Sequence, residues 1–101
     1  MNKPYVIYLL VDNNKVPFYV GATKNFIQRR KQHKYEATHR NTLPVHTKLK
    51  TLLNQGISLE DIMILKDDNL TKKQASKIEI RLIKTFNNEG VELCNIRKGG
   101  I

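Results

Sequence analysis

The chain has 101 residues, of which 40% are hydrophobic and 27% charged, a composition typical of one globular domain, expected over residues 1–101. Lys and Arg number 18 against 9 Asp and Glu, which gives a net charge of +9. This charge favours a polyanionic partner, and nucleic acid is the first candidate. No apolar run approaches the roughly 20 residues of a membrane span, and the single cysteine, Cys94, excludes an internal disulfide and a multi-cysteine zinc site. Because a single cysteine is typical of a reducing compartment, we expect a cytoplasmic or nucleoid-associated protein, and the first apolar run, with no cleavage site after it, is predicted to be a strand and not a signal peptide.

The first part of the chain predicts a β-hairpin. Residues 5–11 (YVIYLLV) are β-branched and aromatic, residues 12–15 supply a turn, and residues 17–21 (PFYVG) return as a second strand. Such a hairpin can bring Tyr8 and Tyr19 side by side on one face of the sheet. Buried tyrosines are usually core residues, so the pair alone does not indicate a functional site.

A basic helix is predicted over residues 26–36, with Asn25 as its N-cap. Its face should be apolar if the helix packs on a core, yet Arg29, Arg30 and His33 lie there. Arg29 and His33 are one turn apart and can converge on one point. For an isolated helix, a solvated basic face is the simpler interpretation.

The remaining elements complete an α+β pattern. A second helix is predicted over residues 44–55, a short central strand over 61–66, a long helix from the cap at Thr71 to about residue 87, and an extended tail over 91–96. The order β-β-α-α-β-α predicts a small, three-stranded, mainly antiparallel β-sheet flanked by helices.

The long helix carries a carboxylate within its apolar stripe. Glu79 falls near the middle of a stripe made of Ala75, Ile78, Leu82, Ile83 and Phe86. A buried carboxylate is costly unless it is paired or binds a metal, so a structural hydrogen bond and a metal-ligand role are both open. The acid of this helix and the bases of helix 26–36 break two stripes at once, which favours one shared polar site.

These residues, in this order, resemble the GIY-YIG nuclease family. The matching segments are VIY (6–8), YVG (19–21), RRKQH (29–33), KIEIRLIK (77–84) and LCNIRKGG (93–100), so the resemblance spans essentially the whole chain. Each tripeptide is weak by itself, whereas five elements in order with matching spacing are specific. Val6 stands where the glycine that gives the first motif its name usually lies.

The resemblance implies a GIY-YIG endonuclease-like fold and hydrolysis of DNA phosphodiesters with one divalent cation, Mg²⁺ or in its place Mn²⁺. Carried over position by position, it implies catalytic roles for Tyr8, Tyr19, Arg29, His33, Glu79 and Asn95, with Glu79 as the metal ligand. Tyr8 is the preferred general base, with a pKa lowered by nearby cations, and His33 or Tyr19 would orient the water or tune Tyr8. Arg29 would stabilise the charge on phosphate.

DNA contacts are expected mainly at the phosphate backbone, which predicts low sequence specificity unless a partner supplies it. The residues expected to make them are Lys24, Arg30, Lys31, Lys34, Arg40 and His46. Cutting both strands requires a homodimer or two successive events, and an accessory protein would add specificity. The small size suggests a phage or mobile-element origin.

Two alternatives remain open at this stage. The first is a catalytically inactive module of the same fold that binds DNA or inhibits another protein, with Val6 as a sign of decay. The second is a generic basic domain that binds RNA or a protein, which does not explain the acid in the apolar stripe.

Overall fold

A computed structural model describes residues 3–40 and 42–95 of the chain. The elements follow in the order β1 (Tyr5–Val11), β2 (Pro17–Thr23), α1 (Phe26–His39), α2 (Pro44–Asn54), α3 (Leu59–Ile62), β3 (Met63–Leu70) and α4 (Lys72–Asn88). The strands form one antiparallel sheet with the spatial order β2-β1-β3. The predicted α+β class and three-stranded sheet are confirmed, and the short helix α3 is the one addition to the expected order.

The third strand differs from the prediction in both bounds and place. Residues 59–62 form the helical turn α3, so β3 begins at Met63 and not at residue 61. β3 is also an edge strand, and the expectation of a central strand here is wrong, because β1 pairs with both neighbours. Burial explains the order: five consecutive residues of β1 are buried, whereas β3 exposes six consecutive residues. Only a strand that is apolar on both sides is stable in the middle of a covered sheet.

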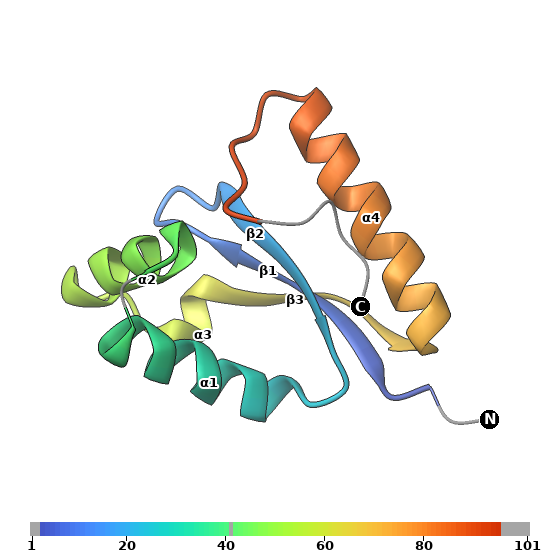
Figure 1. The fold of residues 1–101 in the computed structure, drawn as a ribbon, viewed down its shortest axis with the longest axis horizontal. Helices are drawn as coiled ribbons and strands as arrows, with labels where there is room; N and C mark the ends of the chain where they lie inside the picture. Colours follow the sequence, from blue (N-terminus) through green and yellow to red (C-terminus); the bar gives the residue numbers. More distant parts are fainter. Residues whose placement is uncertain (1–2, 41, 96–101) are drawn as a thin grey trace.

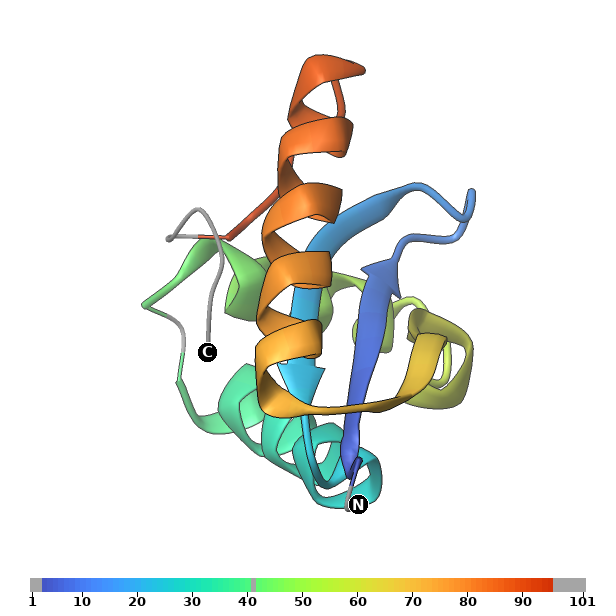
Figure 2. The same ribbon diagram turned by 90° about the vertical axis from the view of Figure 1, so that its right-hand side faces the viewer.

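Helices cover both faces of the sheet (Figure 1). α4 lies over one face, and α1 and α2 lie on the other side, which the turned view in Figure 2 also shows. Two buried clusters match these layers: one joins alternate β1 residues to α4, and the other joins Tyr8 and Leu10 to α1 and α2. Among the described residues, no helix has the length and apolar character needed to span a bilayer.

The helix ends follow the expected chemistry. The Asn25 side chain accepts a hydrogen bond from the backbone N–H of Gln28, and Thr71 with Gln74 forms a complete capping box. α1 runs to His39, beyond the predicted end at residue 36, because Ala37 is buried against the core and keeps that turn attached.

Candidate active site

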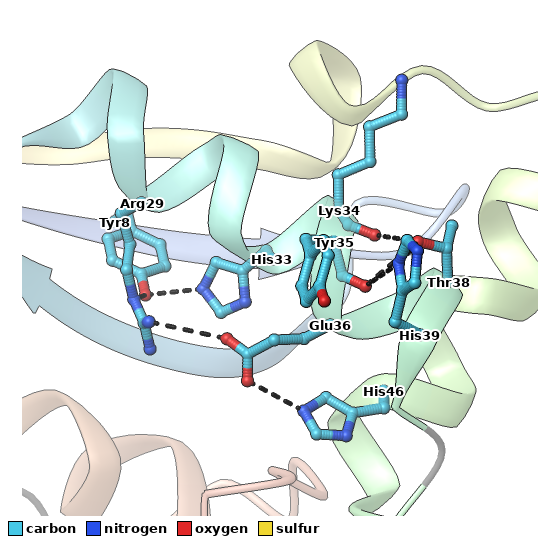
Figure 3. A network of polar contacts seen from close by, with 9 residues as sticks. All are labelled: Tyr8, Arg29, His33, Lys34, Tyr35, Glu36, Thr38, His39 and His46. Carbon is cyan, nitrogen blue, oxygen red and sulfur yellow. Dashed lines mark hydrogen bonds and ion pairs between the residues drawn. The ribbon is translucent and has the colours of Figure 1, made fainter.

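The hydroxyl of Tyr8 is the point where two side chains of α1 meet a strand (Figure 3). Tyr8 Oη lies 2.8 Å from His33 Nε2 and accepts a hydrogen bond of 3.2 Å from Arg29 Nε–H. Tyr8 and His33 are 1% and 3% exposed. In the His33 tautomer with hydrogen on Nδ1, the phenol donates its proton to His33 Nε2 while its oxygen accepts from the guanidinium. The predicted convergence of Arg29 and His33 is confirmed.

Burial favours the uncharged form of both of these groups. It raises the pKa of Tyr8 well above its ordinary value, an effect that Arg29 opposes and that Tyr19 and Glu79 reinforce. Burial also lowers the pKa of His33 to about 3, and Arg29 and the neighbouring His46 ring act in the same direction. The expectation that nearby cations lower the pKa of Tyr8 is therefore wrong, because the cost of burying a phenolate outweighs the attraction of one guanidinium.

The second tyrosine lies beside the first, as the hairpin predicted. The ring centroid of Tyr19 is 6.3 Å from that of Tyr8 and 5.7 Å from that of His33. In the β1–β2 register Tyr8 lies opposite Gly21, and a Cβ at Gly21 would overlap the Tyr8 ring and hydroxyl. The glycine of the YVG motif thus allows the Tyr8 ring to lie against the β2 backbone. Val6 lies opposite Thr23 and is partly buried.

The end of the described chain holds the β2 backbone in place. Asn95 donates from Nδ2 to the carbonyl of Val20 at 2.8 Å and accepts at Oδ1 from the Val20 N–H at 3.0 Å. The N–H of Cys94 donates to the Phe18 carbonyl. These bonds fix the strand between Tyr19 and Gly21, so Asn95 supports the site through the backbone. Residues 91–95, where an extended tail was predicted, form no helix or strand, and residue 96 lies outside the described residues.

Glu79 is buried on α4, as its position in the apolar stripe predicted. It is 8% exposed, and its charge makes the smallest of the named contributions to the raised pKa of Tyr8. Carboxylate oxygens are ligands that Mg²⁺ prefers, and Mg²⁺ commonly completes its coordination with water and phosphate. Within the described ranges, no three His, Cys, Asp or Glu side chains are grouped to hold a metal. A cation held by Glu79 would take most of its other ligands from water and substrate.

Two residues extend the polar network beyond the predicted set. Glu36 Oε1 lies 3.8 Å from Arg29 Nη1, and Glu36 Oε2 lies 3.3 Å from His46 Nε2. Glu36 was not predicted as a site residue, although its place seven residues after Arg29 puts it on the same flank of α1. His46 is 3% exposed, so its predicted contact with nucleic acid is wrong: α1 and α2 enclose the imidazole and direct it at Glu36.

The other predicted DNA-binding residues occupy different surroundings. Four are exposed, namely Lys24, Lys31, Lys34 and Arg40. Arg30 is engaged within the protein, with its Cζ 4.9 Å from the centroid of the Phe26 ring and its Nη1 4.0 Å from a carboxylate oxygen of Glu60.

The basic surface of α1 is divided between two flanks. Arg30, Lys31 and Lys34 line a groove that α3 borders through Leu59. Arg29, one residue before this group, instead joins Tyr8 on the other flank. The helical period separates the two sets, so the cations that appear as one patch in the sequence do not share one surface.

One of three comparisons with known proteins gave a match. A family model described as the GIY-YIG catalytic domain matches residues 4–92, a span that holds Tyr8, Tyr19, Arg29, His33 and Glu79 and ends just before Asn95. Searches of curated proteins and of solved structures gave no match. Since the family match covers nearly the whole chain, this protein belongs to the GIY-YIG family of nuclease catalytic domains.

Proposed function

We propose that this chain is a metal-dependent endonuclease that hydrolyses DNA phosphodiester bonds with a single divalent cation and little sequence preference of its own. The observation that carries the proposal is the convergence of Arg29 and His33 on the Tyr8 hydroxyl in a chain of a nuclease family. A guanidinium and an imidazole that both contact one phenol oxygen suit the transfer of a proton next to an anionic phosphate.

In this proposal Tyr8 and His33 act together on the attacking water. Tyr8 Oη takes a proton from the water while its own proton passes to His33 Nε2, along the 2.8 Å hydrogen bond already present. The relay avoids a free phenolate, which the raised pKa of Tyr8 disfavours. The negative charge of a bound phosphate would raise the pKa of His33 and so favour the transfer.

Arg29 and Glu79 have complementary tasks. Arg29 uses Nε–H for Tyr8, and its other N–H groups would bind the phosphate oxygens and stabilise the charge that develops on them. Glu79 would hold Mg²⁺, with Mn²⁺ as a substitute. When bound, the cation supplies positive charge close to the phosphate.

The exposed cations are proposed to bind the DNA backbone. Lys24, Lys31, Lys34 and Arg40 offer charges without a fixed pattern of hydrogen bonds, which suits phosphate contacts more than base recognition. Double-strand cleavage would need two copies of the site or two successive events.

Nicking of supercoiled plasmid tests the proposal. The wild type should nick in Mg²⁺ and not in EDTA, and Glu79→Gln and Arg29→Ala should each lower the rate by about 100-fold or more. Glu89→Gln and Arg81→Ala, at exposed positions, are the matched controls and should keep the rate. Tight DNA binding without nicking in either buffer would favour the inactive binding module. A folded protein that neither binds nor nicks DNA would contradict both the endonuclease proposal and the binding module.

A further inference from the structure

We infer that Glu36 and His46 form a positioning pair that fixes the guanidinium of Arg29 for phosphate binding. The inference rests on the proposed function, because it assigns the pair to the same cleavage site. The four side chains Tyr8, Arg29, Glu36 and His46 form a continuous chain of contacts from β1 through α1 to α2 (Figure 3).

Arg29 is held at two different nitrogens. Its Nε–H bonds to Tyr8 Oη at 3.2 Å, and its Nη1 lies 3.8 Å from Glu36 Oε1. A guanidinium is planar and rigid, so two contacts on separate nitrogens restrict both its position and the orientation of its plane. With Tyr8 alone, the plane could still turn about the one hydrogen bond.

The length of the Arg29–Glu36 contact leaves donors for a substrate. At 3.8 Å it exceeds the range of about 2.7–3.2 Å for an N–H···O hydrogen bond. Glu36 therefore attracts the guanidinium through its charge without occupying its N–H groups in a tight bidentate pair. Those groups remain able to bond two oxygens of a phosphate.

His46 explains why Glu36 stays at this position. A carboxylate only accepts hydrogen bonds, so His46 Nε2 must carry the proton in the 3.3 Å contact with Glu36 Oε2. The other ring nitrogen, Nδ1, is buried with no hydrogen-bond partner among the described residues. The tautomer with hydrogen on Nε2 leaves an unused acceptor there, which costs less than burying an unused charged donor. The ring is thus set to bond Glu36.

The simpler alternative is that the pair only joins α1 to α2. In that case its removal would lower stability and leave the chemistry of the folded protein unchanged. A positioning role differs in one respect: the effect must pass through Arg29 and appear in the chemical step.

The first test compares Glu36→Gln with Glu60→Gln in the full-length chain. Glu60 of α3 lies 4.0 Å from Arg30 of α1, so it provides a second Glu–Arg pair on the other flank of α1. Plasmid nicking in Mg²⁺ should show kcat lowered by about 10- to 100-fold in Glu36→Gln with KM changed less than about threefold. Glu60→Gln should keep both constants. Thermal unfolding of each variant shows that the assays were made on folded protein.

His46 variants and a second readout complete the test. His46→Gln retains an N–H donor and should keep most of the rate, whereas His46→Leu should repeat the loss of Glu36→Gln. In ¹H–¹⁵N NMR spectra the Arg29 Nε–H should exchange slowly with water in the wild type, and faster in Glu36→Gln but not in Glu60→Gln. This signal does not depend on nicking, so it separates failure of the inference from failure of the proposed function. An unchanged kcat and unchanged Arg29 exchange in Glu36→Gln would overturn the inference.

Discussion

Burial determines which chemistry Tyr8 and His33 can perform. Both side chains are almost fully enclosed, and the pKa of each moves in the direction that removes its charge. This environment disfavours a mechanism that requires Tyr8 to be a phenolate before the reaction begins. A neutral hydroxyl that is hydrogen-bonded to both a guanidinium and an imidazole needs only to pass a proton along.

The same burial predicts a pH dependence of stability. His33 has a pKa of about 3 in the folded protein and about 6.5 when unfolded. Between these values the unfolded chain binds a proton that the folded chain excludes, so the free energy of unfolding is maintained above pH 6.5 and falls as the pH drops toward 3. The slope reaches about 1.4 kcal/mol per pH unit.

Denaturant unfolding between pH 7 and 4 measures this effect. His33→Gln should lose part of the pH dependence, whereas His39→Gln, at an exposed position of the same helix, should keep it. Equal slopes for wild type and His33→Gln would contradict the lowered pKa of His33.

At the scale of elements, the pairing of β1 with β2 places Tyr8. Because a Cβ at Gly21 would overlap the Tyr8 ring, Gly21→Ala should displace the hydroxyl from Arg29 and His33. We expect a loss of stability of about 1–3 kcal/mol from overpacking, together with a strong loss of nicking. Urea unfolding and the plasmid assay on one preparation measure both.

Gly90→Ala is the control for this prediction. Gly90 follows α4 with φ of +81°, so alanine there costs about 1–2 kcal/mol of backbone strain and leaves the site intact. Comparable destabilisation with retained nicking in Gly90→Ala, and lost nicking in Gly21→Ala, would attribute the effect to Tyr8. Retained nicking in both variants would mean that the Tyr8 ring moves away from the added methyl group without loss of activity.

How far the sequence predicts these elements depends on whether the relevant interaction is local. The caps at Asn25 and Thr71 and the break in the stripe at Glu79 involve neighbours along the chain, and all three are confirmed. The Glu36–His46 contact joins two helices through a tertiary approach that periodicity does not contain. The direction of the Tyr8 pKa was likewise missed, because a nearby cation is visible in the sequence and the depth of burial is not.

For the molecule as a whole, net charge and its placement govern association with DNA. The net charge of +9 predicts an affinity that falls steeply with salt, by a slope of about −0.9 in log K against log salt for each phosphate contact. Lys24→Gln should reduce the magnitude of the slope by about 0.9, because Lys24 is an exposed cation directly after β2, the strand that carries Tyr19.

Fluorescence anisotropy with a short duplex in EDTA measures this slope without cleavage. Lys66→Gln, an exposed cation on the opposite edge strand β3, serves as the control and should leave the slope unchanged. The same reduction in both variants would indicate a diffuse charge effect and no contact at Lys24.

The most direct measurement is the single-turnover nicking rate of Tyr8→Phe beside Tyr35→Phe, with wild-type protein and Mg²⁺ as reference. Both changes remove one hydroxyl, but Tyr8 is enclosed with Arg29 and His33 and Tyr35 is exposed. We predict a rate reduced by about 100-fold or more in Tyr8→Phe, in keeping with general acid–base catalysis, and no change in Tyr35→Phe. A Tyr8→Phe protein that is folded and nicks at the wild-type rate would contradict the assignment of this hydroxyl to the reaction.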